Sequence, residues 1–150
     1  GGGSDMSALS QILRREIENK LVFIVGHVDY GPNLMDFYRS ADLFVFPSFG
    51  EGFPRVLYES MANSLPIVSS DVGGIARSVP HEQRGLLFDS ARPELLTASV
   101  LRVVNDGSLR RKIIRNQITF MSDFLIRSDG GAQVHELLEA NSVRNGDHEL

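Results

Sequence analysis

Residues 48–68 read SFGEGFPRVLYESMANSLPIV and predict a helix, Pro54–Ala62, that is followed by a strand. Pro54 suits the first helical position, because its fixed φ is helix-like and its missing N–H would have no partner there. The free N–H groups of Arg55 and Val56 would then point out of the positive end of the helix dipole. Helix ends of this kind bind anions, and phosphate above all. The stretch therefore predicts an anion site at the start of a helix.

Two carboxylates bracket this helix start. Glu51 lies just before it, and Glu59 lies about a turn and a half inside the helix. Acidic groups beside a phosphate site are unusual unless they accept hydrogen bonds from neutral hydroxyls. A sugar and a ribose joined by a diphosphate offer that combination. Taken without their surroundings, the two residues also fit a solvated pair near a helix start, where acids are favoured.

Short apolar runs alternate with amphipathic segments along the chain, which predicts α/β units around a largely parallel sheet. The run Leu21–Val25 is continuous, β-prone and ended by Gly26, as expected of a strand that is covered on both faces. The predicted strands are Leu21–Val25, Leu43–Phe46, Pro66–Ser69 and Gly85–Phe88.

Helices are predicted between these strands. The first carries apolar residues at the spacing of one helical face, with Ser4 or Ser7 available as its cap. These apolar residues are Leu9, Ile12, Leu13 and Ile17. Further helices are predicted to begin near Pro32, Pro54, Pro93, a capping Ser108 and Gln133. One domain over residues 1–141 is expected, with a polar tail, Ser142–Leu150, after a helix at Gln133–Ala140.

The bulk composition excludes several classes. A net charge of −4 argues against a broad nucleic-acid surface, and the absence of cysteine excludes disulfides and thiolate metal sites. The apolar runs are far shorter than the ~20 residues of a membrane helix. The amino terminus, GGGSDMS, lacks the pattern of a secretory signal, so a cytoplasmic location is expected. Its glycines fit either an artificial linker or a loop after a strand upstream of Gly1.

The sequence contains four motifs in a fixed order. They are VFIVGHVDY, ADLFVFPS, EGFPRVLYESMANSLPIVSSDVGGIA and RGLLFD. In this order they resemble the carboxy-terminal domain of family 4 glycosyltransferases over roughly Gly1 to Phe124. The family has the GT-B architecture, in which two Rossmann-like domains face each other across a cleft. The resemblance implies a Rossmann-like parallel sheet flanked by helices, in the donor-binding part of a retaining glycosyltransferase.

The family's pair of glutamates corresponds here to Glu51 and Glu59. The resemblance implies that Glu51 is catalytic, accepting hydrogen bonds from hydroxyls of the donor sugar and holding it for transfer. Glu59 would bind both ribose hydroxyls of the nucleotide. Gly52 and Phe53 would let the backbone approach the sugar closely.

The remaining donor contacts follow from the same resemblance. The N–H groups of Arg55 and Val56 would hold the diphosphate, and the turn Gly26-His27-Val28 would border the nucleobase. That turn is expected at the carboxyl end of a strand, where ligands of open α/β sheets bind. His27 also fits an exposed loop histidine without a ligand. No metal or other cofactor is implied, and the partners are a nucleotide-diphosphate sugar and a missing amino-terminal, acceptor-binding domain.

The chain departs from the family pattern at two places. The usual small-Gly step before Leu-Pro is Asn63-Ser64, and Asn tolerates the left-handed conformation at a helix end. Arg77 stands where an acidic residue is common. Gly73-Gly74, just before it, fits either a tight turn or a phosphate-binding loop.

Three functions remain open from the sequence. The first is transfer of a hexose or related sugar, with the chain alone inactive or nearly so. The second is a nucleotide-sugar epimerase of the same architecture, and the third is a noncatalytic nucleotide-sugar-binding or scaffolding domain. A basic cluster on a predicted helix fits a solvated face or contact with an anionic membrane or partner. It consists of Arg110, Arg111, Lys112 and Arg115.

Overall fold

The computed structural model describes residues 3–52 and 54–127. The chain divides into two compact units, Gly1–Met35 and Asp36–Leu150. Three predicted features lie outside the described residues: Phe53, the helix Gln133–Ala140 and the tail Ser142–Leu150. The single domain expected over residues 1–141 stays a prediction.

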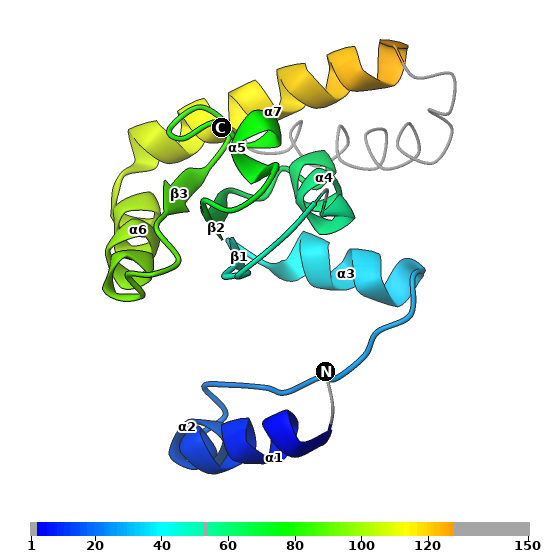
Figure 1. Ribbon diagram of the computed structural model, residues 1–150. Coiled ribbons are helices and arrows are strands. Elements are labelled where there is room, and N and C mark those ends of the chain that lie inside the picture. Colours follow the sequence, from blue (N-terminus) through cyan, green and yellow to red (C-terminus); the bar gives the residue numbers. More distant parts are fainter. Residues whose placement is uncertain (1–2, 53, 128–150) are drawn as a thin grey trace, which may run out of the picture. The chain divides into compact units, whose positions relative to one another are not determined.

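The second unit contains a sheet of three parallel strands (Figure 1). Their order in the sheet follows the sequence, with Phe44 opposite Ile67 and Ser70 opposite Phe88. The strands are β1 (Phe44–Phe46), β2 (Ile67–Ser70) and β3 (Leu86–Phe88). The predicted strands in this unit are confirmed to within one residue at each end. The predicted α/β class with a parallel sheet is confirmed as well.

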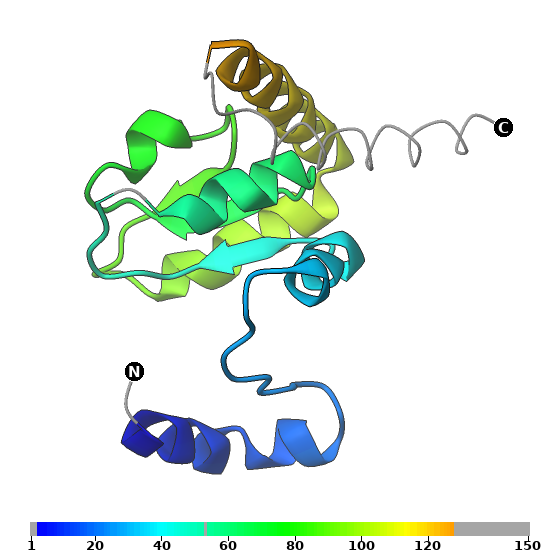
Figure 2. The same cartoon turned by 90° about the vertical axis from the view of Figure 1, so that its right-hand side faces the viewer.

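Helices cover both faces of the sheet (Figure 2). Their bounds are α3 (Pro32–Ser40), α4 (Arg55–Ala62), α5 (Ile75–Ser78), α6 (Glu94–Asn105) and α7 (Gly107–Arg127). Residues that alternate along β2 point to opposite faces, as strand geometry requires. Ile67 packs with α4 and α5, whereas Val68 packs with α6. The long helix α7 joins both clusters, with Met121 in the first and Ile113 in the second.

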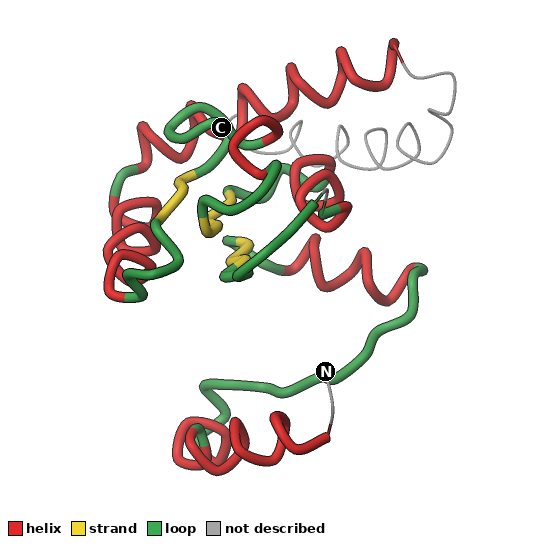
Figure 3. Tube along the Cα trace, in the orientation of Figure 1, coloured by secondary structure: helices red, strands yellow, loops and turns green. Residues whose placement is uncertain are grey.

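The predicted strand Leu21–Val25 is wrong. The run is loop in Figure 3, and none of its residues belongs to a strand ladder. Its side chains remain largely open, with Leu21 75% and Phe23 73% exposed. An apolar, β-prone sequence forms a strand only where a neighbouring strand takes up its backbone N–H and C=O groups. Within the described residues this run has no such neighbour.

The predicted first helix is divided into α1 (Gly3–Ile12) and α2 (Arg14–Glu18). The division is slight, because the N–H of Leu13 still donates to the carbonyl of Leu9, at 2.9 Å. Both candidate caps, Ser4 and Ser7, lie inside α1, so the predicted capping role is wrong.

Two predicted helix starts need correction. Pro54 is the N-cap of α4 and not its first residue, because its ψ of 110° is extended although its φ of −74° is helix-like. Ser108 lies inside α7, and Asp106 supplies the cap. The Asp106 carboxylate accepts hydrogen bonds from the Ser108 hydroxyl at 2.6 Å and the Leu109 N–H at 2.9 Å. These bonds, that of Ser108 first, lower the pKa of Asp106.

The carboxyl end of α4 is a Schellman motif. The N–H of Leu65 donates to the Ser60 carbonyl at 3.0 Å, and that of Ser64 donates to the Met61 carbonyl at 3.0 Å. Ser64 takes the left-handed conformation, with φ +56°, whereas Asn63 has φ −93°. The expectation that Asn63 would take this conformation is therefore wrong by one residue.

Candidate functional site

Two loops meet at the carboxyl edge of the sheet, one after β1 and one after β2. A Cβ built on Gly73 would lie 1.8 Å from the carbonyl oxygen of Glu51, and one on Gly74 would lie 2.7 Å from that of Gly52. Gly73 also has φ +55°, which L-residues rarely adopt. This close packing accounts for both glycines as a turn that supports the loop carrying Glu51.

Glu51 is half-buried on the loop after β1. The Ser48 hydroxyl donates a hydrogen bond to its Oε1 at 2.7 Å. The backbone carbonyl of Ser48 in turn accepts a hydrogen bond from the hydroxyl of Ser70, which is fully buried at the end of β2. This hydrogen bond from the last residue of β2 fixes the loop that carries Glu51 to the sheet.

Glu59 is half-buried in the second turn of α4. The Tyr38 hydroxyl, from α3, donates a hydrogen bond to its Oε2 at 2.9 Å. Only 6% of Tyr38 is exposed. Burial, and then the bond to Glu59, raises the pKa of Tyr38 above its ordinary value, so the hydroxyl keeps its proton and remains a donor.

The start of α4 lies between these two carboxylates in the sequence. Arg55 is exposed and Val56 half-buried in the first turn, which contains no acidic residue. The first N–H groups of a helix have no acceptor within it, and the dipole makes this end positive. Gly52, on the approach to the helix, is exposed. These features are compatible with an anion at this end of α4, and the predicted anion site stays a prediction.

The turn Gly26-His27-Val28 belongs to the first unit. Gly26 has φ +80°, and the His27 ring is 87% exposed with its Nε2 3.1 Å from an Asp29 carboxylate oxygen. Val28 is half-buried. The turn follows the extended run 21–25, which is not a strand. Its role beside a nucleobase stays a prediction.

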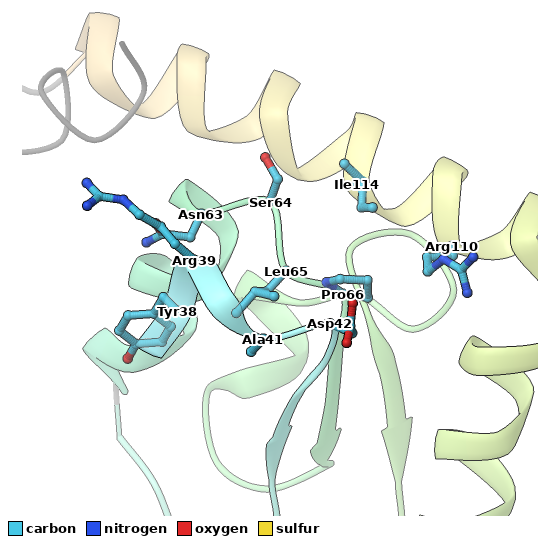
Figure 4. A pocket seen from close by; sticks show the side chains of 10 residues that line it. All are labelled: Tyr38, Arg39, Ala41, Asp42, Asn63, Ser64, Leu65, Pro66, Arg110 and Ile114. Atoms are coloured by element: carbon cyan, nitrogen blue, oxygen red, sulfur yellow. The ribbon is translucent and has the colours of Figure 1, made fainter. Parts of the chain in front are cut away.

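A pocket of about 290 Å³ opens at the opposite, amino edge of the sheet (Figure 4). Tyr38 lines it, but neither Glu51 nor Glu59 does. Its two guanidinium groups, of Arg39 and Arg110, lie on opposite sides in Figure 4 and do not converge. The pocket therefore shares Tyr38 with the Glu59 contact but is lined by neither carboxylate.

The basic cluster of α7 is only partly solvated. The Arg110 guanidinium donates to the carbonyls of Val103 and Val104 at the end of α6, at 3.3 and 3.0 Å. The other three members, Arg111, Lys112 and Arg115, are exposed. Contact of this cluster with a membrane surface stays a prediction.

Comparison with protein families identifies the domain. The family described as "Glycosyl transferases group 1" matches residues 1–120. The chain belongs to this family. An uncharacterized glycosyltransferase of Methanocaldococcus jannaschii is 37% identical to this group 1 chain over 100 residues, 67% of the chain and 25% of the relative. A D-inositol 3-phosphate glycosyltransferase of Thermobispora bispora is 40% identical over 75 residues, 50% of the chain and 18% of the relative.

A solved structure supports the same family. Sucrose-phosphate synthase from Thermosynechococcus elongatus matches the group 1 chain with a TM-score of 0.70 and 26% identity. The match covers 81% of this chain and 30% of the synthase. The predicted likeness to GT-B glycosyltransferases is confirmed at the level of the fold. The group 1 chain spans about a quarter or less of the length of the two curated relatives.

Two further features bear on metals and membranes. Among the described residues, no three His, Cys, Asp or Glu side chains come together as metal ligands would. The expectation that no metal is needed stays a prediction. Of the helices within residues 3–52 and 54–127, none is long and apolar enough to cross a membrane.

Proposed function

We propose that this chain is the donor-binding part of a cytoplasmic, retaining glycosyltransferase of family 4. It would hold a nucleotide-diphosphate sugar while a hexose or related sugar moves to an acceptor. One arrangement at the carboxyl edge of the sheet supports the proposal most strongly. The loop that carries Glu51 leads into the start of α4, and Glu59 follows in the second turn of that helix. Membership of group 1 supports it.

The two carboxylates divide the donor between them. Glu51 accepts hydrogen bonds from hydroxyls of the donor sugar, and Glu59 accepts them from the ribose. The diphosphate lies at the N–H groups of Arg55 and Val56, whose partial positive charge stabilises the leaving group as the glycosidic bond breaks. The leaving diphosphate helps to deprotonate the acceptor hydroxyl on the same face of the sugar. The chain's own contribution is positioning and electrostatic stabilisation.

The acceptor site belongs to another part of the protein under this proposal. The match to sucrose-phosphate synthase covers only 30% of that enzyme, which leaves room for a second domain across a cleft. This group 1 chain is then the carboxy-terminal, donor-side domain. The two alternatives, an epimerase and a noncatalytic binding domain, gain no support from relatives that are named as glycosyltransferases.

Nucleotide binding tests the ribose role of Glu59. In the protein as it is encoded in full, calorimetric titration with UDP, GDP and ADP identifies the nucleotide that binds. Glu59→Ala removes two charge-assisted hydrogen bonds and weakens that nucleotide at least about tenfold. Glu94→Ala, an exposed glutamate on α6, serves as the matched control and leaves the affinity unchanged. An unchanged affinity in Glu59→Ala would falsify the ribose role.

Transfer activity tests the catalytic role of Glu51. Glu51→Ala in the full protein lowers the rate of sugar transfer by about a hundredfold or more, because the donor sugar loses its positioning group. Its affinity for the nucleoside diphosphate without sugar stays that of the wild type. Full transfer activity in Glu51→Ala excludes the assigned role.

A further inference from the structure

We infer that Ser48 and Tyr38 are positioning residues, each of which holds one of the two glutamates by a single hydroxyl hydrogen bond. The inference rests on the proposed donor-binding function. It adds that the sugar end and the ribose end of the donor are held by two separate hydroxyl–carboxylate pairs. Each pair can be removed without the other.

The sugar-side pair is Ser48 and Glu51. Its hydrogen bond joins Ser48 Oγ to Glu51 Oε1 at 2.7 Å, a length typical of a hydroxyl donating to a carboxylate. Ser48 is itself fixed, because the buried Ser70 hydroxyl donates to its carbonyl. The backbone of Gly73 packs closely against that of Glu51, because a Cβ on Gly73 would lie 1.8 Å from the Glu51 carbonyl oxygen. The loop is therefore constrained at both its backbone and its carboxylate.

The ribose-side pair is Tyr38 and Glu59. Tyr38 reaches Glu59 from a different helix, 21 residues earlier in the sequence, with 2.9 Å between the hydroxyl and Oε2. Its ring lies 5.9 Å from that of Phe44, in the first strand of the sheet. A tyrosine held in this way presents its hydroxyl from a fixed place, so the Glu59 carboxylate has one preferred orientation.

Both carboxylates keep room for ligand hydroxyls. An ionised carboxylate offers about four lone-pair sites on two oxygens. From side chains within residues 3–52 and 54–127, one hydroxyl donates to Oε1 of Glu51 and one to Oε2 of Glu59. The sites that remain are enough for two ligand hydroxyls at each residue. The hydroxyl partners thus orient the carboxylates without occupying them.

The test compares binding of the nucleotide alone with binding of the nucleotide sugar. The full protein is titrated with UDP, GDP and ADP, and with UDP-glucose, GDP-mannose and ADP-glucose, and the pair that binds the wild type is kept. Ser48→Ala weakens the nucleotide sugar roughly five- to tenfold and leaves the nucleoside diphosphate unchanged. Ser48→Thr, which keeps the hydroxyl, restores the wild-type affinity.

Tyr38→Phe has the complementary effect. It weakens the nucleotide and the nucleotide sugar by the same factor, roughly five- to tenfold, because both contain the ribose. With the 2′,3′-dideoxy form of the same nucleoside diphosphate, Tyr38→Phe and the wild type bind equally. General damage to the fold would weaken the dideoxy form as well, so this probe separates positioning from stability.

Matched controls remove a comparable hydroxyl elsewhere in the second unit. Tyr58→Phe deletes a hydroxyl that lies 2.8 Å from Ser78 Oγ, and Ser40→Ala deletes one that donates to the Phe37 carbonyl at 3.2 Å. Both bind nucleotide and nucleotide sugar as the wild type does.

The outcomes separate this inference from the proposed function. If Glu51→Ala and Glu59→Ala weaken their ligands but Ser48→Ala and Tyr38→Phe do not, the inference is overturned and the function stands. The inference is also overturned if Tyr38→Phe weakens the dideoxy nucleotide as much as the ribonucleotide. If the wild type binds none of the six probes, the proposed function fails and the inference fails with it.

Discussion

Gly73 lies where both the backbone conformation and the available space favour glycine. Its φ of +55° lies in the left-handed region, and a Cβ there would overlap the carbonyl oxygen of Glu51. Gly50, on the loop after β1, has open space around it instead. At the scale of single residues, the position of the Glu51 backbone thus depends on residue 73 having no Cβ.

Gly73→Ala is predicted to destabilise the domain and displace the Glu51 loop. The left-handed conformation alone costs an L-residue about 1–2 kcal/mol, and relief of the overlap requires movement of the Glu51 backbone. Urea unfolding should show a loss of at least that size, together with weaker binding of nucleotide sugar. Gly50→Ala is the control and should change stability by less than about 0.5 kcal/mol. Wild-type stability in Gly73→Ala would contradict the packing described.

Tyr38 predicts a pH dependence of stability. Its pKa is raised in the folded protein, while in the unfolded chain it is near 10. Its contribution is complete below pH ~10 and is lost as the pH rises toward the folded pKa, because only the unfolded chain then releases the proton. The stability advantage of the wild type over Tyr38→Phe should therefore be constant below about pH 10 and shrink from about pH 10 to about pH 11. A constant difference in urea unfolding across this range would argue against the buried hydroxyl.

The residues of the candidate site differ in how well the sequence alone predicts them. Glu51 and Glu59 could be predicted, because they bracket a proline at a helix start within a recognisable motif. Ser48 lies three residues before Glu51, and its hydroxyl contact depends on the shape of the loop. Tyr38 could not be predicted as a partner, since its contact with Glu59 arises only when α3 and α4 pack together.

At the scale of elements, α4 is the helix on which the proposed site depends. It begins at Arg55 beside the Glu51 loop and ends in the Schellman motif at Ser64. A helix of eight residues is too short to be stable alone, so its caps and its buried face decide whether it forms. Leu57 and Met61 on that face are completely buried.

Ser64→Gly is predicted to stabilise the domain by about 0.5–1 kcal/mol. Relief of the left-handed serine is worth about 1–2 kcal/mol, and the greater freedom of glycine in the unfolded chain offsets part of it. The measurement is the free energy of unfolding in urea. Ser64→Ala is the matched control and should give no gain, because alanine keeps the strained φ. Equal stability of the two variants would contradict the motif.

The elements also show where sequence patterns fail. Leu43–Phe46 and Leu21–Val25 are similar apolar runs, but only the first becomes a strand, because β2 pairs with it. Two predicted helix starts also differ from the structure by one or two residues. Proline fixes φ but not ψ, and Asp106 competes with Ser108 as the acceptor for the first N–H groups of α7.

At the scale of the whole molecule, the sheet of the second unit sets the location of the proposed site. Its alternating side chains bury apolar clusters on both faces, which leaves the loops at the carboxyl edge as the place for ligand groups. The sequence predicted this arrangement because βα alternation and strand polarity are local properties. The packing of Gly73 against Glu51 and of Tyr38 against Glu59 is not local, and no spacing in the sequence encodes it.

The most direct test of the proposed donor site is a structure of the full protein with its nucleoside diphosphate bound. We expect the Glu59 carboxylate within hydrogen-bond distance of both ribose hydroxyls. We also expect the diphosphate at the N–H groups of Arg55 and Val56. A nucleotide bound elsewhere, with Glu59 turned away from its ribose, would contradict the proposed site.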